Sequence, residues 1–374
     1  MSQNAEEQNS GQTANRTNRQ TRRFQERQAS KAAKKVATLN MNGFGNLHRD
    51  SPENKWSGIN RMMVEKRIAV LMLQETHLTE ELKDRVEAMF SRKLKIFSSP
   101  DPSYPTRRNG VAIVLNRRLI SADDAKATVI VPGHALHLNV QWQPNERKNL
   151  LVIYAPTSAG LSARKDFFIK VGEFYKARTH LPRPCLMAGD WNCIEDEVDR
   201  LPMRHQTRTD PSVEELDNLK LDLGMKLTDG WRATYSDRME YTFVRQTSQG
   251  ARLSRLDRIY CSEAVFRTAR QWQISEPPVK TDHSVVSVML TSEQAPEIGR
   301  GRWTMPEFLI KDKFMRDYTK KRGIQALEEV SDLQRTGRSE GNNAQIILAK
   351  FKEDVREKAR ERQRILVPNL QQKI

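Results

Sequence analysis

Short apolar runs separated by polar stretches fill the middle of the chain. In residues 136–142 every second side chain is apolar, which is the period of a strand with one buried face. In residues 55–65 the apolar side chains Ile59, Met62 and Met63 recur at helical spacing. The pattern predicts strands at 36–40, 68–74, 110–115, 136–142, 150–154, 185–188, 241–245, 255–260 and 284–290. It predicts helices at 55–65, 163–178 and 213–223.

Mixed strands and helices at this density predict a layered α/β domain over residues 36–290. Two sheets packed face to face would let strand ends from both sheets meet at one cleft. Beyond this domain, residues 291–374 are charged and predicted to form a helical connector or tail. Its second helix, 344–366, has one apolar face that needs a partner surface, and 336–343 is predicted to be a flexible linker before it.

Residues 1–35 are rich in Gln, Asn, Ser and Arg, and Phe24 is their only large apolar side chain. Such a segment buries too little surface to offset the entropy of ordering, so we expect a disordered basic arm. Its pairs Arg22-Arg23 and Lys34-Lys35 suit nuclear import or DNA contact. A solvated tail explains them equally well.

The net charge of the chain indicates what kind of partner the protein binds. The 374 residues carry a formal charge of +16, which favours a polyanionic partner without requiring one. The sequence has three cysteines, Cys185, Cys193 and Cys261, and they lack CxxC spacing. Neither a disulfide framework nor a zinc ribbon is therefore indicated. No apolar stretch is long enough for a signal peptide or a membrane span. We therefore expect an intracellular protein, in the nucleus if DNA is its partner.

Carboxylates and amides stand at the ends of predicted strands. Glu75 follows a buried run and is a hard oxygen ligand of the kind that Mg²⁺ prefers, although a solvated Glu at a strand end needs no metal. Asp190 and Asn192 follow Gly189, which permits close backbone approach. Asp190 is suited to orient or deprotonate a water, and the Asn192 amide to donate to a phosphate oxygen. Both residue types also form turns, so a structural role fits them as well.

A histidine and two further side chains complete the candidate chemistry. His283, once protonated beside a carboxylate, would stabilise negative charge that accumulates on phosphorus. Asp257 lies inside a predicted strand, where an unpaired carboxylate would be costly, so we expect it to orient His283. The phenol of Tyr154 is suited to donate to the scissile phosphate, although a tyrosine at a strand end often only packs.

The order of these motifs along the chain resembles the endonuclease/exonuclease/phosphatase superfamily across residues 36–290. The motifs are Asn-x-Asn-Gly, Gln-Glu-Thr, Tyr-Ala-Pro, Gly-Asp-x-Asn, Tyr-Thr-Phe, Leu-Asp-Arg-Ile and Asp-His-Ser. The segments 38–43 and 73–79, and Gly189-Asp190-Trp191-Asn192 followed by Asp199-Arg200-Leu201-Pro202, are most similar to the endonuclease domain of non-LTR, LINE-type retrotransposons. This resemblance implies a four-layer α/β sandwich of two mixed sheets flanked by helices, like pancreatic DNase. It also implies nicking of duplex DNA that leaves a 3′-hydroxyl to prime reverse transcription.

The resemblance further implies residue roles. It places Asn40, Glu75 and Asp282 at a metal site for Mg²⁺ or Mn²⁺. It places Tyr154 and Asn192 on the phosphate, Asp190 with the water and Asp257 behind His283. The DNA-contacting set that it implies is Asn42, Thr157, Thr242, Arg200, Arg204 and Arg208. Abasic-site repair relatives have Asp in place of Asn42 and Asn in place of Thr157, so both residues favour the retroelement branch. The arginines lie in the 199–210 loop, which is equally consistent with a solvated basic loop.

The tail resembles the stretch between nuclease and polymerase in such elements, notably at 301–306 and 351–354. Ala122-Asp123-Asp124 lacks the aromatic residue expected before a reverse-transcriptase aspartate pair, so we expect a missing reverse-transcriptase region or a partner that docks on 303–366. Two alternatives to DNA nicking stay open. One is the same fold acting on RNA or phosphoinositides, and the other is a non-catalytic relic that binds DNA.

Overall fold

The computed structural model describes residues 31–48, 51–157, 160–202, 210–223, 227–298 and 303–371. The chain divides into two compact units, Met1–Ile298 and Gly299–Ile374. Of the sequence predictions, most of the 1–35 arm, together with Arg204 and Arg208, lies outside the described residues.

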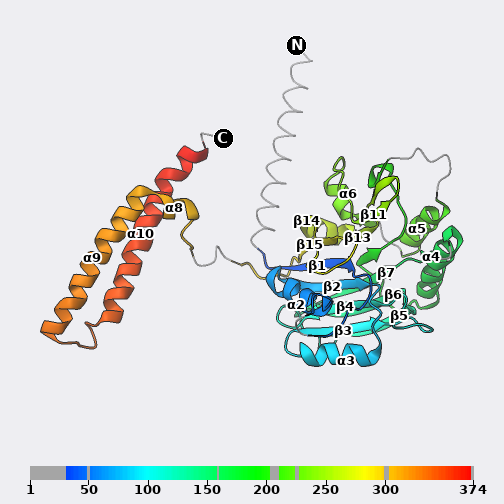
Figure 1. The fold of residues 1–374 in the computed structure, drawn as a ribbon, viewed down its shortest axis with the longest axis horizontal. Coiled ribbons are helices and arrows are strands. Elements are labelled where there is room, and N and C mark those ends of the chain that lie inside the picture. Colours follow the sequence, from blue (N-terminus) through cyan, green and yellow to red (C-terminus); the bar gives the residue numbers. More distant parts are fainter. Residues whose placement is uncertain are drawn as a thin grey trace, which may run out of the picture. The chain divides into compact units, whose positions relative to one another are not determined.

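Two six-stranded sheets form the body of the first unit (Figure 1). The first has the order β14 (Ala269–Ser275), β15 (Val285–Thr291), β1 (Ala33–Asn40), β2 (Ile68–Gln74), β4 (Val111–Asn116) and β3 (Leu94–Ser99). The second has the order β10 (Leu227–Asp229), β13 (Asp257–Ser262), β8 (Leu186–Asp190), β7 (Glu146–Tyr154), β6 (Ala135–Gln143) and β5 (Lys126–Val131). Both sheets are mixed, since β1 pairs with β2 and β7 with β8 in parallel while the other neighbours are antiparallel.

The sheets pack face to face through one apolar core. Val70 and Met72 of β2 enter this core from one side, and Leu150 and Val152 of β7 enter it from the other. Alternate residues of the same strands point outward, as the two-residue period of a strand requires. Leu71 therefore lies in a separate outer core, with α2 and α3.

Helices cover the outer faces of both sheets. The helices α2 (Lys55–Glu65) and α3 (Glu80–Met89) pack on the first sheet, and α4 (Gly160–Ala177) and α5 (Pro211–Asp222) pack on the second. Helix, sheet, sheet and helix are four layers, so the predicted four-layer sandwich is confirmed.

Gly189 makes the contact between β7 and β8 possible. A Cβ atom built there would lie 1.8 Å from the carbonyl oxygen of Ile153, and the residue has a φ of +156°. Only glycine fits this approach. Its position also sets where Asp190, the next residue, leaves the sheet.

A small three-stranded sheet and two short helices complete the first unit. The sheet has the order β11 (Phe243–Thr247), β12 (Gly250–Ser254) and β9 (Arg200–Leu201), which follows the 3₁₀ helix Glu197–Asp199. The helices are α6 (Gly230–Thr234) and α7 (Glu263–Thr268).

The second unit is helical, with α8 (Glu307–Lys311), α9 (Lys313–Thr336) and α10 (Ala344–Gln371). Leu309, Met315 and Ala359 form its small buried core. The break between α9 and α10 coincides with the predicted linker at 336–343. None of the described helices is both long and apolar enough to cross a bilayer.

Sequence patterning missed specific elements. The strands that it did not predict include β3, β5, β10 and β14, and the helices include α3, α6 and α7. The predicted strand at 241–245 is shifted, because β11 begins at Phe243 and continues to Thr247. The predicted arm was also drawn too long at its end, since β1 already begins at Ala33 and its register with β15 includes Lys34 and Lys35.

Candidate active site

Side chains from the ends of both sheets meet around Asn40. This residue ends β1 and is fully buried. Its Nδ2 donates to Oε1 of Glu75 at 2.8 Å and to Oδ2 of Asp190 at 3.0 Å. Because Glu75 follows β2 of the first sheet and Asp190 ends β8 of the second, one amide joins the two sheets at their edge.

Glu75 lies between Asn40 and Tyr154. The Tyr154 hydroxyl, at the end of β7, donates to Oε1 of Glu75 at 2.8 Å. Burial and the nearby carboxylates of Glu75 and Asp190 raise the pKa of Tyr154, so its phenol stays a proton donor. Within the described part of the chain both hydrogen bonds to the Glu75 side chain end on Oε1. Neither of these two bonds uses the other oxygen, Oε2, so it would be available to a cation.

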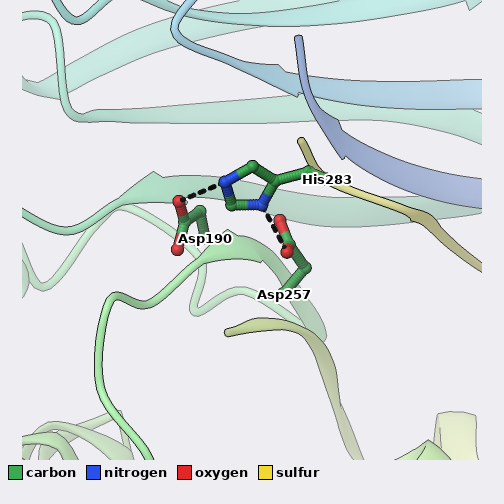
Figure 2. A group of neighbouring side chains, drawn as sticks. All are labelled: Asp190, Asp257 and His283. Atoms are coloured by element: carbon green, nitrogen blue, oxygen red, sulfur yellow. Dashed lines mark hydrogen bonds and ion pairs between the residues drawn. The ribbon is translucent and has the colours of Figure 1, made fainter. Parts of the chain in front are cut away.

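His283 lies between two buried aspartates (Figure 2). Its Nδ1 is 2.8 Å from Oδ2 of Asp257, and its Nε2 is 3.9 Å from Oδ2 of Asp190. The two aspartates are paired across β13 and β8, which fixes their spacing. Burial opposes a charge on the imidazole, but Asp257 and Asp190 outweigh it and raise the pKa of His283 to about 10. The ring is therefore an imidazolium at neutral pH.

The carboxyl group of Asp190 has a pKa near neutral pH. Burial, followed by the negative charge of Asp257, raises the pKa of Asp190 to about 7. The backbone N–H of Asn192 donates to its Oδ1 at 3.0 Å. The Asn192 side chain is held in turn by the carbonyl of Ala155, which accepts from Nδ2 at 2.7 Å. Asn192 has a left-handed φ of 49°, as Glu75 does, and such strain gathers at functional sites.

The outer rim of the cluster is formed by Asn42 and Asp282, which are both exposed. The backbone N–H of Asn42 donates to Oδ1 of Asn40 at 3.0 Å, and its Nδ2 donates to Oδ1 of Asp282 at 3.1 Å. Asn42 is also left-handed, with a φ of 47°. A continuous chain of contacts therefore runs from Asp282 to Glu75.

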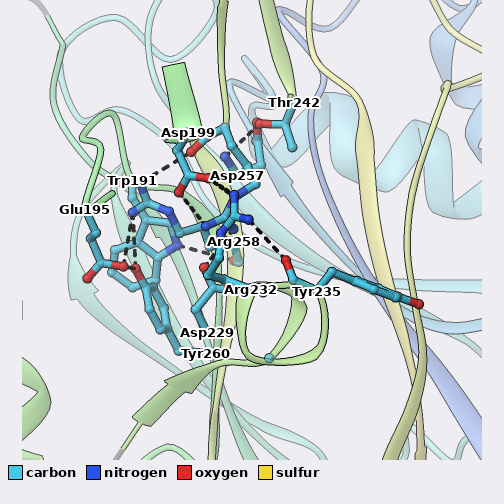
Figure 3. A network of polar contacts seen from close by, with 12 residues as sticks. Trp191, Glu195, Asp199, Asp229, Arg232, Tyr235, Thr242, Asp257, Arg258 and Tyr260 are labelled. Atoms are coloured by element: carbon cyan, nitrogen blue, oxygen red, sulfur yellow. Dashed lines mark hydrogen bonds and ion pairs between the residues drawn. The ribbon is translucent and has the colours of Figure 1, made fainter. Parts of the chain in front are cut away.

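Asp257 is supported by Thr242 and by a buried ion-pair network (Figure 3). Oγ1 of Thr242 accepts the backbone N–H groups of Leu256 and Asp257, each at 3.0 Å. Arg255, just before them, donates to both carboxylate oxygens of Asp199, at 2.8 and 2.6 Å. These bonds fix the start of β13, and with it the position of the Asp257 carboxylate.

Two groups of residues are candidates for a divalent cation. Asp190, Asp257 and His283 offer atoms within 4.8 Å of one another. A protonated imidazole has no lone pair for a metal, so this group fits proton transfer better. Asn40, Glu75 and Asp282 offer only oxygen ligands, which is the donor set that Mg²⁺ prefers. The donor chemistry of the second group therefore fits a divalent cation, and this ligand set stays a prediction.

The residues predicted to contact DNA fall in two places. Asn42 and Thr242 belong to the cluster, and Thr157 is near enough to share a hydrogen bond with the Tyr154 hydroxyl. Arg200 lies on β9 of the small sheet, opposite Ser254 of β12. The other two predicted arginines, Arg204 and Arg208, fall in the 203–209 gap between the described ranges.

Sequence reasoning missed two residues at this site. Lys55, the first residue of α2, donates from Nζ to the carbonyls of Met41 and Asn42. The His134 ring stacks on Tyr154 with centroids 5.7 Å apart, and its Nδ1 is 2.7 Å from the Tyr154 carbonyl oxygen. Neither residue stands next to a motif in the sequence, so only the fold reveals them.

Comparisons with known proteins show what this chain is similar to. The chain is 26% identical over 281 residues to the transposon TX1 uncharacterized 149 kDa protein of Xenopus laevis, covering 74% of this chain and 20% of that protein. The chain thus spans about a fifth of its relative's length. The endonuclease domain of TRAS1, a telomere-specific non-LTR retrotransposon, is 13% identical with a TM-score of 0.49, covering 70% of this chain and all of that domain.

The chain shares its fold with another solved structure. The 3′ phosphatase NExo from Neisseria, bound to product DNA hairpin, is 19% identical with a TM-score of 0.53. It matches 70% of this chain and 100% of its own. A model of the endonuclease/exonuclease/phosphatase family matches residues 37–286, a range that includes all the residues of the cluster from Asn40 to His283. The chain belongs to the endonuclease/exonuclease/phosphatase family.

Proposed function

We propose that the protein is a divalent-metal-dependent phosphodiester hydrolase that nicks duplex DNA, as a retrotransposon-type endonuclease. One observation carries the proposal. The Asn40 amide contacts Glu75 and Asp190 together, while Asp190 lies 3.9 Å from His283. The candidate metal ligand Glu75, the candidate base Asp190 and the His283 imidazolium therefore lie in one cluster. Glu75 and His283 are nevertheless separated by 208 positions of sequence.

In this proposal Asp190 receives the proton of the attacking water. Its pKa of about 7 suits a general base that works near neutral pH. Asn40 and the Asn192 backbone N–H each hold one oxygen of its carboxylate. The carboxylate is thus oriented before any substrate arrives, which lowers the cost of reaching the reactive geometry.

Three donors then stabilise the charge that develops on the phosphate. The His283 imidazolium, the Asn192 amide and the Tyr154 phenol come from separate segments and are all buried or half-buried. The Tyr154 hydroxyl has one proton, so it must turn that proton from Glu75 to the phosphate. Removal of one such donor should cost on the order of 3 kcal/mol of transition-state stabilisation. A Mg²⁺ or Mn²⁺ ion held by Asn40, Glu75 and Asp282 would supply Lewis-acid stabilisation of the phosphate and leaving oxygens.

Duplex DNA is the proposed substrate for two reasons. The family region carries a net charge of about +6, which suits a polyanion. Its relative in Xenopus laevis is named as a transposon protein, and the related NExo structure holds product DNA. A retroelement role adds that the nick leaves a 3′-hydroxyl and that the protein works in the nucleus. We further propose that residues 303–366 connect to a reverse-transcriptase region or dock a partner.

Cleavage of supercoiled plasmid with Mg²⁺ tests the proposal. We expect nicked circles from the wild type, and none from Asp190→Ala or His283→Ala. The control Asp84→Ala removes a carboxylate that is 74% exposed on α3, and should nick normally. Mapping the ends should give 3′-hydroxyls.

Competition with oligoadenylate and inositol phosphates separates DNA from the other substrates of the same fold. Undiminished nicking by both active-site variants would rule out the assignment. DNA binding without any metal-dependent turnover by the wild type would favour a non-catalytic relic.

A further inference from the structure

Lys55 is a buried cation at the edge of the cluster. Its side chain is only 6% exposed. Its Nζ donates to the carbonyl oxygen of Met41 at 2.7 Å and to that of Asn42 at 2.6 Å. One ammonium group thus holds two consecutive backbone carbonyls of the segment that follows β1.

The location of Lys55 is unfavourable for a lysine in two ways. Burial of an ammonium group is costly unless its hydrogen bonds are replaced. Lys55 is also the first residue of α2, where the positive end of the helix dipole disfavours a cation and no acidic residue stands in the first turn. A residue held against both effects must gain from the contacts that it makes there, and the two carbonyls are those contacts.

These carbonyls belong to a segment that carries strain. Asn42 has a φ of 47°, which costs a residue with a Cβ on the order of 1 kcal/mol. In this conformation its backbone N–H points at Oδ1 of Asn40 and its Nδ2 at Oδ1 of Asp282. The next residue, Gly43, donates its N–H to the Glu75 carbonyl at 2.8 Å. Asn42 thus contacts the side chains of Asn40 and Asp282, and Gly43, the residue after it, contacts the backbone of Glu75.

We propose that Lys55 is a positioning residue of the metal site, which holds the strained 41–42 segment in the conformation that aims Asn40, Glu75 and Asp282 at a divalent cation. The inference rests on the proposed function. Lys55 itself touches neither the cation nor the substrate.

A role of Lys55 in charge balance alone predicts a different effect on metal affinity than a positioning role does. The carboxylates of Glu53, Asp282 and Glu75 attract the Lys55 ammonium, so the charge competes with a divalent cation for them. If Lys55 only balanced charge, its removal would strengthen metal binding. If it positions the ligands, its removal weakens binding although a competing positive charge is gone. The sign of the change decides between the two roles.

The test is calorimetric titration of the full chain with Mg²⁺ and with Mn²⁺, without DNA. We expect Lys55→Met to raise the dissociation constant about 10- to 100-fold, the range typical of residues that orient metal ligands. Lys280→Met is the control. It removes a cation that is 85% exposed and 3.9 Å from Glu53, and that donates to no carbonyl in the part of the chain that the structure describes. It should leave the dissociation constant equal or lower.

A second variant covers the case in which Lys55→Met melts too low to be titrated. Lys55→Arg keeps the charge, but its branched guanidinium cannot place one nitrogen on both carbonyls. Positioning predicts weaker metal binding for it, and charge balance predicts no change. Hydrogen exchange of the metal-free protein gives an independent readout, with faster exchange of the Asn42 and Gly43 amides in both variants.

The outcomes are separable from those of the proposed function. The inference is overturned, and the proposed function is not, if Lys55→Met binds metal as tightly as the wild type and the exchange of the amides at 42–43 is unaltered. The same holds if Lys55→Arg leaves both metal binding and this exchange unchanged. A wild type that binds no metal would overturn the proposed function. Faster exchange in the variants would then show that Lys55 still holds the segment.

Discussion

The Nδ1 atom of His283 lies 2.8 Å from Oδ2 of Asp257, which pairs across β13 and β8 with Asp190 on the other side of the ring. This placement allows one imidazole to keep a proton that burial alone would remove. It also fixes which ring nitrogen faces Asp190. Since Asp257 occupies Nδ1, the proton on Nε2 is the one available to a phosphate oxygen.

We predict that Asp257→Asn lowers the pKa of His283 from about 10 toward its usual value near 6.5. The pKa is raised in the folded state, so the protonated pair stabilises the fold fully below about pH 6.5. That contribution is lost as the pH rises through about 10. Carbon-detected NMR of the metal-free protein, following the His283 Cε1 resonance, measures the titration directly.

Activity provides the second readout of this pair. In Asp257→Asn the alkaline limb of kcat/KM for nicking should move to lower pH by several units, while the wild type stays active up to about pH 10. The control is His180→Gln, because this histidine lies in the loop after α4, away from the cluster. An unchanged His283 titration in Asp257→Asn would contradict the pairing as the cause.

Glu75→Gln should abolish most metal binding without unfolding the protein. The substituted amide keeps an oxygen that accepts from Asn40 and Tyr154, but loses the charge that attracts a cation. We expect nicking to fall by about 10²- to 10³-fold, as for loss of one strong electrostatic contact. Glu53→Gln, an exposed carboxylate near the same rim, is the matched control and should change the metal dissociation constant little. Equal metal affinity for Glu75→Gln and the wild type would remove Glu75 from the ligand set.

Sequence patterning found the interior strands of the two large sheets and missed their edges. β2 is buried at every position and is predicted with its observed bounds. The four strands that end the sheets, β3, β14, β10 and β5, were all missed. An edge strand lacks a neighbour on one side and is partly exposed, as β5 is, so its apolar run is broken. Backbone hydrogen bonding to a neighbouring strand, as of β5 to β6, makes such segments strands although their own apolar pattern is weak.

The candidate site shows a similar division. Asp190, Glu75 and His283 stand beside recognisable sequence motifs and meet as expected. Lys55 has no such motif, because its contacts are backbone carbonyls whose direction depends on the φ of Asn42. A residue that binds main-chain atoms leaves no trace in the side-chain pattern. The polar side chains of the candidate site could therefore be predicted from the sequence, but the residue that holds the backbone beside them could not.

Gly189→Ala should be among the most destabilising single-methyl changes in this chain. The added Cβ would lie 1.8 Å from the Ile153 carbonyl oxygen, and backbone of two central strands must move to admit it. We expect a loss above about 3 kcal/mol, or no folded protein. Gly250→Ala is the control, since that glycine also has a positive φ, of 107°, but no atom within 4 Å of the added methyl. It should cost only about 1–2 kcal/mol of backbone strain. Similar urea midpoints for the two variants would contradict the role of the β7–β8 contact.

The buried ion pair behind the site predicts a specific sensitivity to acid. Burial opposes the charge of Asp199, but its bonds with Arg255 outweigh burial and hold its pKa below the usual range. The pair therefore stabilises the fold above the unfolded pKa, about 3.9, and the contribution is lost as the pH falls below it. Asp199→Asn leaves the buried Arg255 with Asp229 as its one anionic partner among the described residues, which should cost about 3–5 kcal/mol at pH 7.

Urea unfolding from pH 7 to about pH 3.5 measures this effect. The difference in unfolding free energy between the wild type and Asp199→Asn should be largest at neutral pH. It should shrink as the pH falls below about 3.9, because Asp199 takes up a proton in the unfolded chain before it does so in the folded one. Asp217→Asn, which breaks an exposed ion pair with Lys220, should change stability by less than about 1 kcal/mol at any pH. A difference for Asp199→Asn that stays constant with pH would mean that shape, and not charge, stabilises this network. In that case Asp257 would be positioned by Thr242 alone, and Thr242→Val should then impair nicking far more than Asp199→Asn does.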